Sequence, residues 1–355
     1  MLGAGDLGHR VVVRYRTDRG PTDLLGELTS IDDHELVVRT EAGDERHVPL
    51  AAVVAGKRVG PRPARYSEIL ALERITAAAW PAPETERLGE WLLRAADGWT
   101  NRANSALPLG DAGCDLDAAV RACVAFYTAR GLPPKITVPL PVRRDVARHL
   151  TAAGWIAQPE VLVQTAALDR IIALAGLAGR SVGVGPVDQP GEPAVGTPPA
   201  DADGRTAADT LGPGARRAPA RVTLHERPPS DLLAVVAARK EGLPPAAEHV
   251  LTAVDPVRFV TVHDADGGLL ACARGAVVEG WLHIGLVEVM PHARRRGLGR
   301  VVSVALAEWA WAAGATRAVL QVEGHNEPAK RLYESLGWRT HHTYVTYRQP
   351  PDPAA

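Results

Sequence analysis

Short alternations of apolar and polar residues open the chain and predict a small all-β unit over residues 1–62. Candidate strands cover 9–16, 23–31, 35–39, 45–48 and 52–59, and Gly, Pro and Asp residues mark the turns between them. Five short strands in about sixty residues are typical of an SH3-like or Sm-like barrel. Such a unit either packs against neighbouring domains or docks a partner, and both interpretations stay open.

The pattern then changes to a mixture of helical and strand periods. Helices are predicted over 66–80, 116–130 and 145–153, and strands over 90–95, 100–107, 135–138 and 160–167. Asp115 is a plausible N-cap for the second helix, and Gly131 lies at its C-terminal end. Gly154-Trp155 follows the third helix.

The last part of the chain repeats this order. A strand over 284–289 precedes a basic turn and a helix over 298–313, and a strand over 318–322 precedes a helix over 327–336. Gly337-Trp338 and a final strand that ends near 347 complete the pattern. Aligning Gly154 with Gly337 places Leu150 where Tyr333 lies, so residues 66–183 are interpreted as a second, degenerate copy of the 220–349 region.

Residues 184–219 separate these two regions. They are rich in Pro, Gly, Ala and Asp and have few large apolar side chains. Such a segment buries too little surface to offset the entropy of ordering, which predicts a disordered linker.

Composition narrows the classes of function. The 355 residues carry a net charge of -1, which gives no general attraction to nucleic acid or to an anionic membrane. The three cysteines, Cys114, Cys123 and Cys272, have no metal-ligand spacing and indicate thiols in a reducing cytoplasm. No signal peptide and no long apolar run are recognised. We therefore expect a cytoplasmic protein without a metal, a membrane interaction or an evident nucleic-acid partner.

The most informative stretch is the basic turn before the 298–313 helix. It reads Arg294-Arg295-Arg296-Gly297-Leu298-Gly299-Arg300. Free N–H groups and a positive dipole end make the first turn of a helix a good anion site, and glycine lets backbone approach a ligand closely. The spacing is not that of a P-loop, and Val302 breaks a dinucleotide fingerprint. The pattern therefore indicates a pyrophosphate cradle of another kind.

Arg294-x-x-Gly297-x-Gly299 resembles the acetyl-CoA signature of the GCN5-related N-acetyltransferase (GNAT) superfamily. A second family motif matches in register at Asn326, Ala329, Tyr333, Gly337 and Trp338. The resemblance covers about residues 220–348. It implies an α/β fold with a mixed, mostly antiparallel sheet, and the whole layout resembles actinobacterial proteins that join an SH3-like domain to tandem GNAT folds.

The resemblance also implies the residues of a cofactor site. A bulge would splay the preceding strand from its neighbour and expose main-chain N–H groups to the thioester, and the basic turn would hold the pyrophosphate through N–H groups and arginine side chains. Asn326 would contact the cofactor and cap the helix that follows. The implied set is Val287, Glu288, Val289, Arg294, Arg295, Arg296, Gly297, Leu298, Gly299, Arg300 and Asn326.

For catalysis, the resemblance implies that Tyr333 protonates the leaving thiolate. Period-two counting puts His283 on the face of Val287 and Val289, where an imidazole could relay the proton of the amine. The same counting points Glu288 the other way. Glu288, Glu323 and a chain of waters remain alternatives to His283 as the base.

The resulting hypothesis is an acetyl-CoA-dependent N-acetyltransferase that acts on a primary amine of a small molecule or a protein. A non-catalytic acyl-CoA sensor is the alternative, and a mycothiol-synthase role and a homodimer also stay open. The acceptor itself is not readable, because fold analogy does not determine the substrate.

Overall fold

The computed structural model describes residues 2–60, 62–177, 220–239 and 242–351. The chain divides into two compact units, Met1–Pro63 and Ala64–Ala355. The predicted linker over 184–219 lies outside the described residues. None of the helices in the described ranges is long and apolar enough to cross a membrane.

The first unit is a five-stranded antiparallel sheet in the order β4-β3-β2-β1-β5. Its elements are a 3-10 turn (Ala4–Asp6), β1 (Arg10–Thr17), β2 (Gly20–Ile31), β3 (Glu35–Thr40), β4 (Glu45–Pro49), a second 3-10 turn (Leu50–Ala52) and β5 (Val53–Arg58). Val11, Val13 and Leu28 are fully buried at its centre. All five strands lie close to their predicted positions. The predicted closed SH3-like barrel is not observed, because β4 and β5 stay as unpaired edges in the described sheet.

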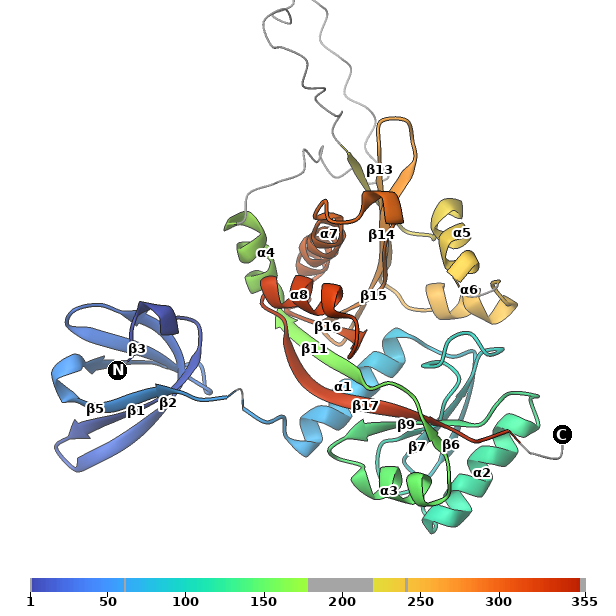
Figure 1. Ribbon diagram of the computed structural model, residues 1–355, viewed down its shortest axis with the longest axis horizontal. Helices are drawn as coiled ribbons and strands as arrows, with labels where there is room; N and C mark the ends of the chain where they lie inside the picture. The colour runs from blue at the N-terminus through green and yellow to red at the C-terminus, as the bar shows by residue number, and fades with distance from the viewer. Residues whose placement is uncertain (1, 61, 178–219, 240–241, 352–355) are drawn as a thin grey trace, which may run out of the picture. The chain divides into compact units, whose positions relative to one another are not determined.

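The second unit contains helices on both faces of a large mixed sheet (Figure 1). Its elements in chain order are α1 (Tyr66–Ala79), β6 (Glu84–Leu88), β7 (Trp91–Ala95), β8 (Leu107–Pro108), α2 (Leu116–Thr128), β9 (Lys135–Leu140), α3 (Arg144–Ala152), β10 (Ile156–Ala157), β11 (Val161–Ala167), α4 (Leu168–Leu177), β12 (Arg221–His225), α5 (Ser230–Arg239), α6 (Pro245–Thr252), β13 (Val257–His263), β14 (Leu269–Val278), β15 (Trp281–Val289), a 3-10 turn (Pro291–Ala293), α7 (Leu298–Ala312), β16 (Arg317–Glu323), α8 (Glu327–Ser335) and β17 (Arg339–Arg348).

The main sheet has nine strands in the order β10-β17-β11-β16-β15-β14-β13-β12, and β9 also pairs with β17. The pair β15–β16 is parallel, whereas the neighbouring pairs are antiparallel. β6, β7 and β8 form a separate three-stranded sheet. A parallel bridge between Ala106 and Ile136 connects the region of β8 to β9.

The two halves of this unit, 64–177 and 220–351, exchange their last strands. β11 of the first half pairs with β16 of the second along the whole of Val161–Ala167. β17 of the second half pairs with β9 of the first, and β11 and β17 also pair with each other. Figure 1 shows both strands running between the group of α7 and α8 and the group of α2 and α3.

The halves also share an order of elements. In each half, one helix connects two strands that neighbour each other in parallel. This helix is α2 between β8 and β9, and α7 between β15 and β16. The next helix, α3 or α8, ends at a glycine with positive φ, 78° at Gly154 and 82° at Gly337. Each glycine takes the left-handed conformation that closes a helix, which explains why both copies keep Gly before Trp.

One local prediction in the first half is wrong, and one strand was missed. The predicted strand over 100–107 is reduced to β8, because residues 100–106 form turns around the side chain of Asn104. The strand β6 was not expected, since Glu84, Thr85, Glu86 and Arg87 are exposed and give no alternation of apolar residues.

Candidate active site

A cavity of about 550 Å³ opens where β15 and β16 separate. Their pairing stops at Ile284 and Leu320. Beyond that point β15 pairs only with β14, and β16 pairs with β11. The cavity is lined by the separated segments 284–288 and 320–323, by α8 and by residues of the first half.

A bulge in β15 sets the direction of the side chains along this wall. Leu286 and Val287 lie opposite the single residue Ala273, and Leu286 has a φ of 53°. The extra residue shifts the alternation of side chains by one position. Val287 and Val289 therefore pack on the α7 side of the sheet, together with Ile284. Leu286 packs on the opposite side with Trp80.

This bulge corrects the predicted faces of β15. Period-two counting placed His283 with Val287 and Val289, but His283 lies on the Trp80 side, with ring centroids 6.1 Å apart. Glu288 also points to this side and forms an ion pair with Arg239 of α5. The counting failed because a bulge inverts the alternation of every residue after it.

The basic turn leads from the end of β15 into α7. Gly297 is the N-cap of α7 with a φ of 77°, and Arg295 also has a positive φ of 60°. No hydrogen bond among the described residues uses the N–H groups of residues 296–299. The N–H of Arg300, which the sequence also assigned to the phosphate, donates to the Gly297 carbonyl at 3.0 Å. The turn therefore offers four free donors rather than five.

The equivalent helix in the first half begins differently. Asp115 is the N-cap of α2, and its carboxylate accepts a hydrogen bond of 2.7 Å from the N–H of Ala118. Asp117 adds a second acidic group to the same turn. A carboxylate from the chain thus occupies the position that an anionic ligand would take, and it repels a second anion.

The arginines of the basic turn have different environments. Arg294 and Arg295 are exposed and Arg296 is partly exposed, and none of the three has an ion-pair partner among the described residues. The Nε of Arg294 donates to the Val289 carbonyl at 3.4 Å. Arg300 donates to the Ser335 hydroxyl at 2.8 Å, which joins α7 to α8. None of these arginines lines the cavity itself.

Gly299 has a packing role that the sequence did not reveal. A Cβ at this position would lie 2.8 Å from Cδ2 of Leu332 on α8. Glycine here lets the first turn of α7 approach α8 closely.

Tyr333 and Asn326 both line the cavity from the α8 side. Asn326 caps α8 as predicted, with its Oδ1 3.2 Å from the N–H of Ala329. Tyr333 is 5% exposed, and its hydroxyl has no hydrogen-bond partner among the described residues. Burial raises the pKa of the Tyr333 phenol, so the group stays protonated at neutral pH.

His283 is fully buried and does not line the cavity. Its Nε2 lies 3.0 Å from Gln321 Oε1 and 3.2 Å from a guanidinium nitrogen of Arg102. Burial, together with the charges of Arg102 and Arg274, lowers the pKa of His283 well below its usual value. The relay role of His283 stays a prediction without geometric support.

Glu288 and Glu323, the alternative bases, both line the cavity. Glu323 is exposed at the end of β16 and lies 3.2 Å from His325. Glu288 is the less exposed of the two, with 20% of its side chain accessible against 58% for Glu323. The bulge thus brings to the cavity a carboxylate that the sequence placed on the opposite face.

Residues of the first half form the rest of the wall, and the sequence did not identify them. They are Trp80, Thr100, Asn101, Arg102, Thr137, Gln158, Pro159 and Val161. Three residues of the second half complete the lining, Arg239 of α5 and Tyr344 and Thr346 of β17. The signal that could have found them is the run of mainly polar residues over 100–105, where a strand was expected.

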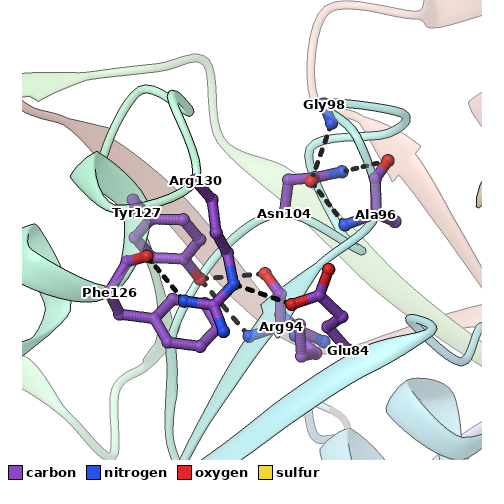
Figure 2. Close-up of polar contacts among 8 residues, drawn as sticks. All are labelled: Glu84, Arg94, Ala96, Gly98, Asn104, Phe126, Tyr127 and Arg130. Atoms are coloured by element: carbon purple, nitrogen blue, oxygen red, sulfur yellow. Dashed lines mark hydrogen bonds and ion pairs between the residues drawn. The ribbon is translucent and has the colours of Figure 1, made fainter.

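The loop 98–105 is fixed by Asn104. Its Oδ1 accepts hydrogen bonds from the N–H groups of Ala96 and Gly98, at 2.8 and 2.9 Å, and its Nδ2 donates to the Thr100 carbonyl at 2.8 Å. Figure 2 shows Asn104 between Ala96 and Gly98. Asn104 is 2% exposed, so these buried bonds hold the loop that carries Arg102.

Comparison with known protein families gives two matches. A family described as "Probable histone acetyltransferase Rv0428c C-terminal" matches residues 66–174 and 198–347. A second family, "Rv0428c N-terminal Sm-like domain", matches residues 5–57. The first unit is therefore Sm-like rather than SH3-like.

Two relatives carry acetyltransferase names. The chain is 38% identical over 157 residues to the probable histone acetyltransferase Rv0428c of Mycobacterium tuberculosis, which is 41% of this chain and 50% of that protein. The match thus spans about half the length of that relative. The chain is 26% identical over 284 residues to the uncharacterized N-acetyltransferase YobR of Bacillus subtilis, covering 76% of this chain and 94% of that protein.

A solved GCN5-related N-acetyltransferase from Kribbella flavida has a similar fold. It aligns with a TM-score of 0.51 and 16% identity over 80% of this chain and 96% of its own. Because the family match covers more than half of the chain, the protein belongs to the family described as "Probable histone acetyltransferase Rv0428c C-terminal", and its fold is similar to that of a GNAT enzyme.

Proposed function

We propose that the protein transfers the acetyl group of acetyl-CoA to a primary amine at the cavity between β15 and β16. The observation that carries this proposal is the separation of these two strands beyond Ile284 and Leu320, together with the free N–H groups at the start of α7. A parallel pair that opens in this way exposes free backbone groups of β15 to a bound thioester.

The start of α7 suits the pyrophosphate. The four N–H groups of residues 296–299 have no partner in the described chain, and the helix dipole adds a positive potential. Arg294, Arg295 and Arg296 supply charge without ion-pair partners of their own. Asn326 and the backbone of Val287 and Glu288 would contact the arm of the cofactor inside the cavity.

The chemistry would be a direct transfer. The amine nitrogen attacks the carbonyl carbon of the thioester, the new C–N bond forms, and the C–S bond breaks. Tyr333 gives its proton to the leaving sulfur, which fits a buried phenol whose pKa is raised. The excess proton of the amine goes to a base, and Glu288 is the carboxylate that we assign to this step.

We infer that the first half is a GNAT fold that does not bind the cofactor. The shared order of elements supports the repeat, and the Asp115 carboxylate at the start of α2 opposes an anion there. Its role would be to complete the sheet and the cavity of the second half. The domain limits that we propose are 1–62, 66–183 and 220–349, with 184–219 between the last two.

The identity of the acceptor is a separate question. The name of the Mycobacterium tuberculosis relative raises a protein lysine as one class of acceptor. Small-molecule amines are the other class.

Calorimetric titration with acetyl-CoA, combined with thiol release over a panel of amines, tests the proposal. Gly297→Glu places a negative side chain at the phosphate site and is better suited than a change at Gly299, which would also clash with Leu332. Binding that this variant abolishes, together with turnover of an amine, supports the proposal. Binding without turnover of any amine would favour an acyl-CoA sensor, and no binding would refute both.

A further inference from the structure

The cavity has two chemically different sides. Tyr333 and Ile284 belong to the apolar cluster that contains α7, and this side faces the proposed cofactor turn. Trp80 belongs to another cluster with α5 and α6, on the opposite face of β14 and β15. If the cofactor approaches from the α7 side, the acceptor enters from the side of Trp80.

Arg102 lines this second side. Its guanidinium carbon lies 5.5 Å from the centre of the Trp80 ring, and one of its terminal nitrogens is 3.2 Å from Nε2 of His283. Its Nε is buried and has no hydrogen-bond partner among the described residues. All of these neighbours are uncharged, since burial and the nearby arginines keep His283 neutral.

The other buried arginines nearby are satisfied by the protein. Arg274 donates to the carbonyls of Leu251, Ala79 and Val250. Arg94 donates to the carbonyl and the hydroxyl of Ser105. These two side chains therefore hold the fold together. Arg102 also has a side-chain hydrogen bond with Tyr344, but its Nε has no partner among the described residues and keeps its donor capacity.

Two other charges of the cavity wall have neighbours of their own. Glu288 forms an ion pair with Arg239, and Glu323 lies 3.2 Å from His325 at the exposed end of β16. Arg102 has no ion-pair partner among the described residues, although it is partly buried. A guanidinium that loses part of its hydration without a counter-charge is costly, and a bound anion would offset that cost.

We infer that the acceptor is a primary amine that also carries a carboxylate, and that Arg102 binds this carboxylate. The geometry points to an amino acid or a similar aminocarboxylate, whose ammonium group would lie toward Glu288. Arginine suits this task because its planar fork matches a carboxylate with two hydrogen bonds. The inference rests on the proposed transferase activity and specifies its substrate class.

The loop that carries Arg102 is built to hold it in place. Asn104 fixes the turn through bonds to Ala96, Gly98 and Thr100, as Figure 2 shows for the first two. A binding group that is already ordered loses less entropy when the ligand arrives. Arg102 is therefore a specificity residue on a fixed support.

Thiol release from acetyl-CoA would be measured with α-amino acids and with the same compounds as carboxamides. Each pair keeps the amine and the side chain and differs only in the negative charge. The full-length protein should prefer the carboxylates by about tenfold to a hundredfold in kcat/KM, as expected for a charge-assisted pair. Arg102→Gln should remove this preference and keep turnover of the carboxamides. Arg121→Gln, on the exposed surface of α2, should leave the preference unchanged.

Two results would overturn the inference and leave the transferase proposal intact. One is equal turnover of carboxylates and carboxamides by the unchanged protein. The other is turnover confined to polyamines or lysine peptides without a carboxylate near the amine.

A binding measurement covers the case in which no amine reacts. N-Acetyl amino acids titrated into the CoA-loaded protein should bind, and their carboxamides and Arg102→Gln should bind at least tenfold more weakly. Equal binding refutes the carboxylate site independently of turnover.

Discussion

Leu150 occupies in the first half the backbone position that Tyr333 occupies in the second. The N–H of Trp155 donates to the Leu150 carbonyl at 3.0 Å, and the N–H of Trp338 donates to the Tyr333 carbonyl at the same distance. The two helix ends are closed by the same hydrogen bond, but only one presents a hydroxyl to a cavity. The chemical difference between the halves is therefore concentrated in side chains rather than in backbone.

The first prediction concerns the hydroxyl of Tyr333. Tyr333→Phe should lower kcat by about a hundredfold, because the leaving sulfur loses its proton donor. The Kd for acetyl-CoA should change little, since the ring remains. Tyr347→Phe is the matched control, a buried tyrosine outside the cavity wall. An unchanged kcat in Tyr333→Phe would exclude the phenol as the acid.

A second prediction uses two glycines at opposite ends of α7. Gly297 and Gly314 have φ angles of 77° and 85°, so alanine at either position should cost about 1 kcal/mol of stability. Gly297→Ala should also weaken acetyl-CoA binding by roughly tenfold, or about 1.4 kcal/mol, because the free N–H groups move. Gly314→Ala should leave binding unchanged. Calorimetry and chemical unfolding of both variants separate the two effects, and equal loss of binding would contradict the cradle.

The close approach of α7 and α8 gives a third prediction. Gly299→Ala should destabilise the protein by about 1–3 kcal/mol, because the added methyl group overlaps with Leu332. The same change in a Leu332→Ala background should cost less, with a coupling energy of about 1 kcal/mol. Urea unfolding of the four proteins measures this coupling. Strictly additive effects would mean that Leu332 is not the obstacle.

The fourth prediction concerns the dependence of stability on pH. The pKa of His283 is lowered in the folded protein. Below about pH 6.5 this imidazole is therefore protonated in the unfolded chain but stays neutral in the native state. The free energy of unfolding should therefore fall from pH 7 to pH 5, with a contribution of up to about 1.4 kcal/mol per pH unit from His283. His283→Gln should flatten this slope, and His292→Gln, at an exposed site, should not.

Tryptophan fluorescence makes this pH measurement specific. All eight tryptophans lie in the second unit, so the signal follows that unit alone. An identical slope for the original protein and for His283→Gln would show that the imidazole is protonated in the native state.

Much of the fold was predictable because its elements are local. Strand and helix periods located α7, β16 and α8 to within one or two residues, and the glycine pattern marked the start of α7. The repeated Gly-Trp pair led to the interpretation of the two halves as copies, and both glycines have the same left-handed conformation. These signals depend on neighbours in the sequence, which is where periodicity and capping act.

What was missed depends on distant parts of the chain or on single-residue irregularities. Arg102 and His283 lie 181 positions apart, and no local pattern connects them. The resemblance implied a bulge in β15, but Leu286 has no sequence feature that marks its positive φ, so the position of the bulge and the inverted faces after it were missed. The pairing of β11 with β17 joins strands from the two halves, and the sequence of each strand fits many partners.

The exchange of β11 and β17 also bears on how such a gene can change over time. A deletion that removed the first half would take away β11 and leave β16 with a bare edge, and it would also remove Arg102 from the cavity wall. The second half therefore depends on the first for its sheet and for its cavity wall. Truncation to either half would leave an open sheet edge, so the two halves of this unit can be kept or lost only together.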